Sequence, residues 1–239
     1  MQDAALLEAR EFQYSDGGGG VGARFLLRQQ PSLEAQLCDL ADQIAYNAHD
    51  IDDGIRSGLL TVEQMREVPL FAMHHDAAIR VSPHLAQARY QRRSVYETIR
   101  LMLSEQVYDV IRTVSAALVS SGVVTSDEVR RHPRLVNFSP EMRELTKDTK
   151  RFLFANLYRH PQIMASREIA KQMLRDLFNI YSERPQEMQS GYSLRATQGT
   201  ESSGSEGEAH RRRVVADFVS GMTDRFAASE HRRLFPAAH

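Results

Sequence analysis

The repeat of apolar residues constrains this chain most, because it follows the 3.6-residue period of an α-helix along almost the whole sequence. Alternation with period two, which a half-buried strand needs, is nearly absent. Residues that typically start and stop helices punctuate the repeat. The sequence therefore predicts an all-α fold.

Composition divides the chain into four segments. Residues 1–30 contain a run of glycines and are predicted to be poorly ordered. Residues 31–182 carry the strongest helical pattern and form the predicted helical body. Residues 183–209 are polar, rich in Gly and Ser and almost free of aliphatic residues, which predicts a linker or disordered loop. Residues 210–239 are predicted to carry a final helix, over 211–233.

Capping residues set the expected helix boundaries within the body. Serine or threonine precedes several predicted helices, and proline or glycine punctuates them. Thr61 and Gln64 are spaced as a capping box. The expected helices cover 32–57, 61–68, 82–121, a short stretch after Ser126, 139–158 and 161–182.

Length, charge and cysteine usage narrow the class of protein. The chain has 239 residues, enough for one large or two small domains. Its net charge of −1 provides no general basic field, which argues against a nucleic-acid partner. No apolar run approaches the ~20 residues of a membrane span, and no secretory signal is visible. The single cysteine, Cys38, fits a reducing compartment, so we expect a cytoplasmic protein.

The predicted helix over 32–57 has an unusually acidic polar face. With Asp42 placed at zero, Tyr46 falls at about +40° and Asp50 at about +80° around the helix. Residues 29–55 contain no Lys or Arg to balance the acids, although like charges one turn apart repel by ~0.2–0.5 kcal/mol per pair. Clustered carboxylates of this kind indicate an external cation or the hydroxyl groups of a ligand. A plain solvated face is the alternative.

Three long stretches resemble one known family. Residues 41–54 read ADQIAYNAHDIDDG, residues 152–161 read FLFANLYRHP, and residues 221–235 contain GMTDRFA followed by EHRRLF. Together, in this order, they resemble the C-terminal part of the HD-domain deoxynucleoside triphosphate triphosphohydrolases, the dGTPase-like family. The resemblance spans about 31–236. It implies an HD-domain-like multi-helix bundle in which the N-terminal, metal-binding half of the family is missing.

The resemblance also implies roles for individual residues. Members of the family hold a divalent metal, Mg²⁺ or alternatively Mn²⁺, through a histidine, a His-Asp pair and a later aspartate. Asp42 takes the position of that aspartate. Tyr46 matches a tyrosine that packs on the nucleotide sugar. Asp50 matches an aspartate that hydrogen-bonds the 3′-hydroxyl. Arg159 falls near a phosphate-contacting arginine, with a helix-end ion pair as the alternative for this residue.

Catalytic residues are expected outside this chain. In the family, the other metal ligands and the general acid lie upstream of the signature helix, so His49-Asp50 is not read as the His-Asp pair. The chain is then a fragment, a mis-started reading frame or a degenerate protein. An alternative metal set lies within the chain; it comprises His49, His75, Asp76 and Asp109.

The function that the resemblance implies belongs to the whole enzyme. It would hydrolyse a deoxynucleoside triphosphate to the deoxynucleoside and triphosphate, as a homo-oligomer. With one of four metal ligands, this chain alone is expected to show no more than trace activity. The alternative is a non-catalytic helical module for oligomerisation or interaction.

Overall fold

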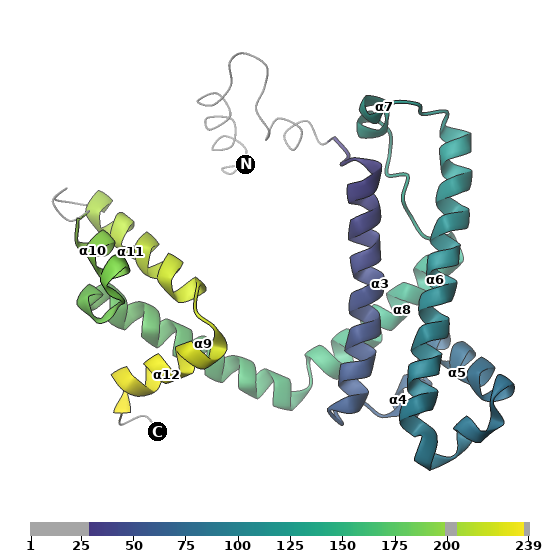
Figure 1. Cartoon of the computed structure of the whole chain (residues 1–239), viewed down its shortest axis with the longest axis horizontal. Helices are drawn as coiled ribbons and strands as arrows, with labels where there is room; N and C mark the ends of the chain where they lie inside the picture. Colours follow the sequence, from purple (N-terminus) through teal and green to yellow (C-terminus); the bar gives the residue numbers. More distant parts are fainter. Residues whose placement is uncertain (1–28, 199–204, 237–239) are drawn as a thin grey trace. The chain divides into compact units, whose positions relative to one another are not determined.

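The computed structural model describes residues 29–198 and 205–236, and every regular element in these ranges is helical (Figure 1). The predicted all-α multi-helix fold is confirmed. The prediction for residues 1–30 lies outside the described residues except for its last two. The chain divides into two compact units, Met1–Tyr158 and Arg159–His239, so the helical body predicted as one piece over 31–182 is split near its end.

The first unit is built around two long helices, α3 (Leu33–Arg56) and α6 (Gln91–Ser121), which lie side by side with α8 (Pro140–Leu153) crossing them (Figure 1). The π-helical turn η3 (Phe154–Tyr158) continues α8. The shorter elements of this unit are α4 (Val62–Met65), α5 (Pro69–Val81), the 3₁₀ turns η1 (Pro83–Ala86) and η2 (Ala88–Tyr90), and α7 (Ser126–Arg131).

Capping chemistry defines the helix ends as the sequence indicates. The Ser32 hydroxyl accepts a hydrogen bond from the Ala35 amide at the start of α3. Thr61 and Gln64 form the predicted capping box, with distances of 2.9 and 3.2 Å. Gly122 ends α6 in the left-handed region, with φ of 66°, which glycine adopts without strain.

The helix predicted over 82–121 is wrong in its first part, and α5 was not predicted. Ser82 precedes Pro83 and has φ −134° and ψ 79°, outside the α region that a following proline disfavours. Two 3₁₀ turns fill the interval before α6 begins at Gln91. The short helix predicted from Thr61 does end before Pro69, at Met65. Pro69 itself occupies the first turn of α5, where a proline costs no hydrogen bond.

The core of the first unit lies between α3, α5, α6 and α8. Ile44 and Ile51 of α3 are 6% and 0% exposed, as predicted from the apolar side of that helix. Leu37 belongs to the same side but is 48% exposed. The apolar surface of α3 therefore extends beyond the part that this unit buries.

The second unit contains α9 (Pro161–Glu183), the 3₁₀ turn η4 (Pro185–Glu187), α10 (Ser190–Gln198), α11 (Ser205–Ser220) and α12 (Asp224–Leu234). Its core is formed by buried residues of these helices. They include Leu177, Tyr181, Ala196, Val214, Val215 and Phe218.

Two predictions in the second unit differ from the described residues. The linker or disordered loop predicted over 183–209 is wrong over 190–198, which form α10, and its residues 199–204 lie outside the described residues. The few apolar residues of α10 belong to the core: Ala196 is fully buried and the Tyr192 ring packs against Phe218. The single final helix predicted over 211–233 is two helices. Thr223 caps the second by accepting a hydrogen bond from the Phe226 amide, which sets the break.

None of the described helices combines the length and the apolar character that crossing a membrane requires.

Candidate functional site

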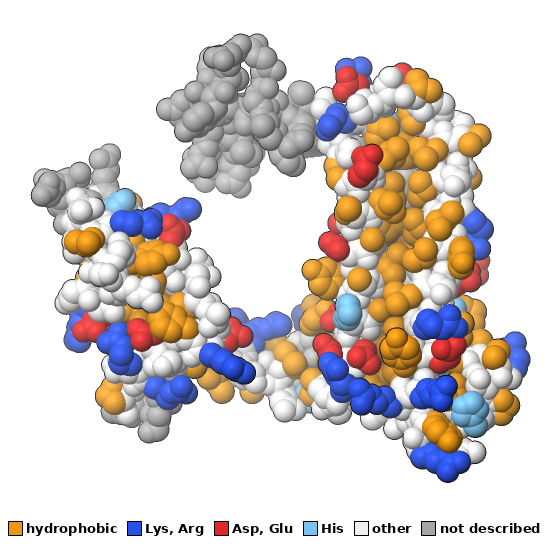
Figure 2. Space-filling view, in the orientation of Figure 1, with side chains coloured by type: hydrophobic (Ala, Val, Ile, Leu, Met, Phe, Trp, Pro, Cys, Tyr) orange, Lys and Arg blue, Asp and Glu red, His pale blue; other side chains and the backbone are white. Residues whose placement is uncertain are grey.

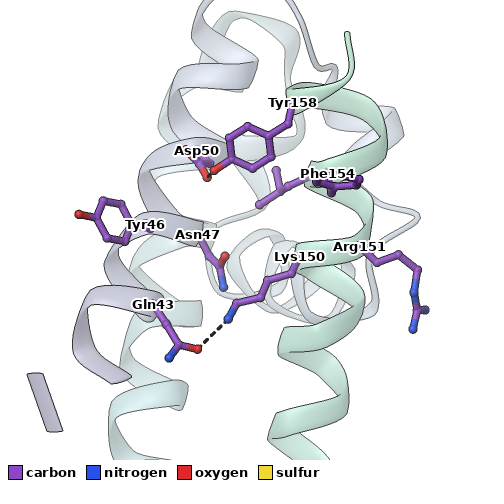
Figure 3. A pocket seen from close by; sticks show the side chains of 9 residues that line it. Gln43, Tyr46, Asn47, Asp50, Lys150, Arg151, Phe154 and Tyr158 are labelled. Atoms are coloured by element: carbon purple, nitrogen blue, oxygen red, sulfur yellow. Dashed lines mark hydrogen bonds between the residues drawn. The ribbon is translucent and has the colours of Figure 1, made fainter. Parts of the chain in front are cut away.

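A cavity of about 560 Å³ opens between α3 and the α8–η3 segment of the first unit (Figure 3). Positions i, i+3, i+4 and i+7 of α3 face it, which is one side of a helix. The lining residues are Gln43, Tyr46, Asn47 and Asp50 from α3, and Lys150, Arg151, Leu153, Phe154 and Tyr158 from the other wall.

The π-helical turn shapes the second wall. A π turn accommodates one extra residue and shifts the helix register by about 100°, and such turns are frequent at functional sites. Here the turn spans Phe154–Tyr158 and lets residues from both α8 and η3 face the same cavity.

Tyr158 and Asp50 are joined across the cavity. The Tyr158 hydroxyl donates a hydrogen bond to Asp50 Oδ2, and Figure 3 shows the two side chains pointing toward each other. The hydrogen bond to Asp50, then burial, then the charge of Asp50 raise the pKa of Tyr158 to about 12. Tyr158 therefore stays a hydrogen-bond donor at neutral pH, and Asp50 Oδ1 accepts no hydrogen bond from any described residue.

The positively charged side chain of Lys150 lines the same cavity as Asp50 and Tyr158. Lys150 Nζ donates a hydrogen bond of 2.7 Å to Gln43 Oε1 (Figure 3). Arg151 is paired with Asp148 at 2.7 Å, whereas no carboxylate within the described part of the chain pairs with Lys150. The charge of Lys150 is therefore available to an anionic ligand.

Asn47 is the most buried polar residue of the cavity wall. Its side chain is turned toward α8 (Figure 3), the residue is 8% exposed, and its Nδ2 has no hydrogen-bond partner among the described residues. A buried amide without a partner costs about 1–3 kcal/mol. The amide is thus a candidate to bind a ligand in the cavity.

The residues predicted from the sequence are placed as follows. Tyr46 and Asp50 line the cavity, although the Tyr46 ring is 66% exposed and turned away from α8 (Figure 3). Asp42 is exposed on the same face of α3, one turn before Tyr46, and does not line the cavity. Arg159 is exposed in the turn after η3 and is the first residue of the second unit, so its phosphate contact stays a prediction.

A metal ion does not fit the described residues by themselves. Mg²⁺ requires about six oxygen ligands in octahedral geometry, several of which can be waters. Asp42 is one carboxylate, and nowhere in 29–198 or 205–236 do three His, Cys, Asp or Glu side chains converge as metal ligands. No chemical step through a metal is therefore derived from these residues.

The alternative set of His49, His75, Asp76 and Asp109 is excluded by the same finding. Arg66 holds two of its members, with Nη1 at 2.8 Å from His75 Nδ1 and 2.9 Å from Asp76. Burial first, and then the charge of Arg66, lower the pKa of His75. Asp109 accepts a hydrogen bond from the Ser139 amide at 2.9 Å, at the start of α8.

Of the nine residues that line the cavity, the sequence analysis assigned Tyr46 and Asp50, and the seven that it missed include Asn47, Lys150 and Tyr158. The sequence does contain features that single out Lys150 and Tyr158. Lys150 is one of three lysines among thirty Lys and Arg residues, and Tyr158 precedes Arg159 within the run FLFANLYRHP.

Comparison with known proteins gives a family match over the C-terminal part of the chain. The profile of the phosphohydrolase-associated domain matches residues 136–233, which include the α8–η3 wall of the cavity. This is the C-terminal type of segment that the resemblance indicated.

Full-length relatives extend the match. The chain is 42% identical over 217 residues to a deoxyguanosinetriphosphate triphosphohydrolase-like protein of Bordetella pertussis, covering 91% of this chain and 53% of the relative. Proteins of the same name from Ralstonia nicotianae and Thiobacillus denitrificans are 43% and 41% identical, again over 91% of this chain, and 52% and 54% of their own lengths are covered. The chain thus spans about half the length of these relatives.

Proposed function

This chain belongs to the deoxyguanosinetriphosphate triphosphohydrolase-like family, and we propose that it forms the deoxynucleoside-binding part of a deoxynucleoside triphosphate triphosphohydrolase. The whole enzyme would convert a deoxynucleoside triphosphate and water to the deoxynucleoside and triphosphate. The observation that carries the proposal is the Asp50–Tyr158 pair, which faces a cavity large enough for a nucleoside.

Asp50 is suited to recognise a sugar hydroxyl. Tyr158 occupies Oδ2, which fixes the carboxylate and leaves Oδ1 to accept a hydrogen bond from the ligand. The rings of Phe154 and Tyr158 provide the apolar wall against which a sugar or base can pack. Tyr46 would contact the ligand at the mouth, one turn from Asp42 and one from Asp50.

Lys150 is suited to the phosphates. A lysine without a carboxylate partner gains a charge-assisted hydrogen bond when a phosphate oxygen approaches. The hydrogen bond of 2.7 Å from Lys150 Nζ to Gln43 Oε1 holds the ammonium group on the α3 side of the cavity. The proposed ligand therefore extends from Asp50, at the sugar, toward Lys150 and Asn47.

Hydrolysis needs more than these residues provide. Water must attack phosphorus while the 5′-oxygen leaves with a proton, and the described residues hold neither a complete metal site nor an assigned acid at this cavity. We therefore propose that the chain alone binds the nucleotide and does not turn it over at an enzymatic rate. A divalent metal at Asp42, a homo-oligomer and a cytoplasmic location remain parts of the proposal.

The test is calorimetric titration of the purified chain with dGTP. Replacing Asp50 by Asn should weaken binding about tenfold to a hundredfold, because a hydrogen bond to a charged group is worth ~1.5–3 kcal/mol. Asp53→Asn makes the same charge change on the same helix, at a residue whose partner is Arg56, and should leave binding unchanged. Equal losses in both variants would contradict a site at Asp50.

The lone Asp42 carboxylate favours a second candidate, a non-catalytic helical interaction module. That candidate requires the chain to associate with itself or with a partner and to bind no deoxynucleotide. The same titration decides whether the chain binds a deoxynucleotide.

A further inference from the structure

Buried polar atoms without a hydrogen-bond partner occur at three side chains in the described part of the first unit. They are Asn47 Nδ2, Gln106 Oε1 and Thr146 Oγ1, and the three residues are 8%, 3% and 4% exposed. Asn47 lines the cavity between α3 and α8, whereas Gln106 and Thr146 do not. Of these three side chains, Asn47 is therefore the one that can pair with a ligand in this cavity.

The acceptors nearest to Asn47 on the same side of α3 are already assigned. Gln43, one turn earlier, accepts a hydrogen bond of 2.7 Å from Lys150 through its Oε1 atom. Asp50, one turn later, accepts the Tyr158 hydroxyl through Oδ2, and its Oδ1 atom is the acceptor proposed for the sugar hydroxyl. The acceptor for the Asn47 amide therefore has to come from the ligand.

Asn47 lies between the sugar end and the phosphate end of the cavity. Measured along the α3 axis at 1.5 Å per residue, it is about 4.5 Å from Asp50 and about 6 Å from Gln43. Figure 3 shows its side chain projecting from α3 toward Lys150. In a nucleotide, the 5′-oxygen and its phosphate lie beyond the 3′-hydroxyl by a span comparable to one helical turn. A sugar anchored at Asp50 thus brings the α-phosphate opposite Asn47.

We propose that Asn47 binds the α-phosphate, the phosphate attached to the 5′-oxygen, by donating an Nδ2–H hydrogen bond to one of its oxygens. This inference rests on the proposed function, because it takes the sugar to be anchored at Asp50. It adds a residue that distinguishes 5′-phosphorylated ligands from nucleosides. The contact lies next to the bond between phosphorus and the 5′-oxygen, which the proposed hydrolysis breaks.

An uncharged donor suits this position. A carboxamide pairs with a phosphate oxygen through a charge-assisted hydrogen bond, yet it buries no second positive charge beside Lys150 while the cavity is empty. Figure 2 shows acidic and basic side chains interspersed over the lower part of α3 on the face turned to the viewer. Because charges of both signs lie there, binding of a phosphate relies on individually placed donors rather than on a general positive field.

The experiment is calorimetric titration of the complete chain with deoxyguanosine, dGMP and dGTP. Asn47→Ala should weaken binding of dGMP and dGTP by the same factor, about tenfold or more, because both ligands carry the α-phosphate and lose a hydrogen bond to a charged group. Binding of deoxyguanosine, which has no phosphate, should be nearly unchanged.

Thr146→Val is the matched control. Valine has nearly the shape of threonine, so this variant removes another unpaired buried atom, on α8, without altering the cavity wall. Its affinities for the three ligands should equal those of the wild type.

A measurement on the wild type does not depend on how the variants fold. In nuclear magnetic resonance spectra, the side-chain amide protons of Asn47 should move downfield when dGMP is added and stay in place when deoxyguanosine is added. A purely structural role for Asn47 would not produce this difference between the two ligands.

Several outcomes would overturn the role of Asn47 and leave the proposed function standing. They are an unchanged affinity of Asn47→Ala for dGMP, an equal loss for deoxyguanosine and dGMP, and a loss for dGTP alone, which would place the contact beyond the α-phosphate. An amide that responds equally to deoxyguanosine and dGMP would also overturn it. If the wild-type chain binds none of the three ligands, the proposed function fails, and the role of Asn47 fails with it.

Discussion

Tyr158 donates its hydroxyl hydrogen to Asp50 and so connects the π-helical turn to α3 across 108 residues of sequence. The bond fixes one carboxylate oxygen and leaves the other facing the cavity. Because the two residues belong to opposite walls, the bond also sets the width of the cavity at this point. Recognition of a sugar hydroxyl by Asp50 therefore depends on Tyr158 as well.

Removing the Tyr158 hydroxyl tests whether ligand recognition by Asp50 depends on Tyr158. Tyr158→Phe should lower the free energy of unfolding by about 0.5–1 kcal/mol, at the low end for a hydrogen bond because the residue is 39% exposed. It should also weaken dGTP binding severalfold, since Asp50 is no longer held. Urea unfolding and calorimetry measure the two effects. Tyr96→Phe, which removes a hydroxyl from a 69% exposed ring outside the cavity, should change neither.

Alkaline pH should reveal the same bond. Asp50 and burial raise the pKa of Tyr158 from 10.0 to about 12. Because the pKa is higher in the folded state, the bond contributes fully to stability below about pH 10 and is lost as the pH rises toward about 12. The free energy of unfolding should therefore fall more steeply between these values in the wild type than in Tyr158→Phe. Parallel pH profiles for the two proteins would exclude this linkage.

Lys150 should distinguish nucleotides from nucleosides. Lys150→Ala is expected to weaken binding of dGTP about tenfold and to leave binding of deoxyguanosine nearly unchanged, because only the triphosphate contacts the ammonium group. Lys147→Ala is the control on the same helix, where Glu144 already pairs with the lysine at 3.2 Å. The idea fails if both ligands lose affinity equally in Lys150→Ala.

Gly54 marks a close approach of α3 to its neighbours. A Cβ added there would lie 2.6 Å from Leu60 Cδ1, and Leu60 is 2% exposed and cannot move aside freely. Gly54→Ala should destabilise the chain by about 1–3 kcal/mol. Gly191→Ala, in α10 with nothing within 4 Å of the added atom, should stabilise it by up to ~1 kcal/mol. Thermal unfolding of both variants checks the contrast.

The sequence predicted best those features that depend on a single helix, namely its extent and the face that it buries. The single helix α3 and the placement of Ile44 and Ile51 in the core follow from local periodicity and are confirmed. Tyr158 and Lys150 could not be assigned in this way, because their partners lie 108 and 107 residues away on another helix. Their contacts arise from packing, which periodicity does not encode.

The errors in the fold have the same physical origin. The prolines at 69 and 83 each permit either the end or the start of a helix, and the choice depends on what the flanking residues bury. Phe71 of α5 is fully buried, and this burial stabilises a helix that starts at Pro69. In the second unit, Ala196 and Tyr192 supply enough core contact to order α10 within a polar segment.

Chemical-shift mapping of dGTP on the isotope-labelled chain tests the central claim most directly. If the α3–α8 cavity binds the deoxynucleotide, the Asn47 side-chain amide and the backbone signals of Gln43, Asp50 and Tyr158 should shift together and saturate. Asp50→Asn should move the midpoint of these shifts to a dGTP concentration about tenfold to a hundredfold higher. The claim is contradicted if saturating dGTP leaves these signals in place, or if shifts appear only in the second unit's cavity near Asn179 and Arg212.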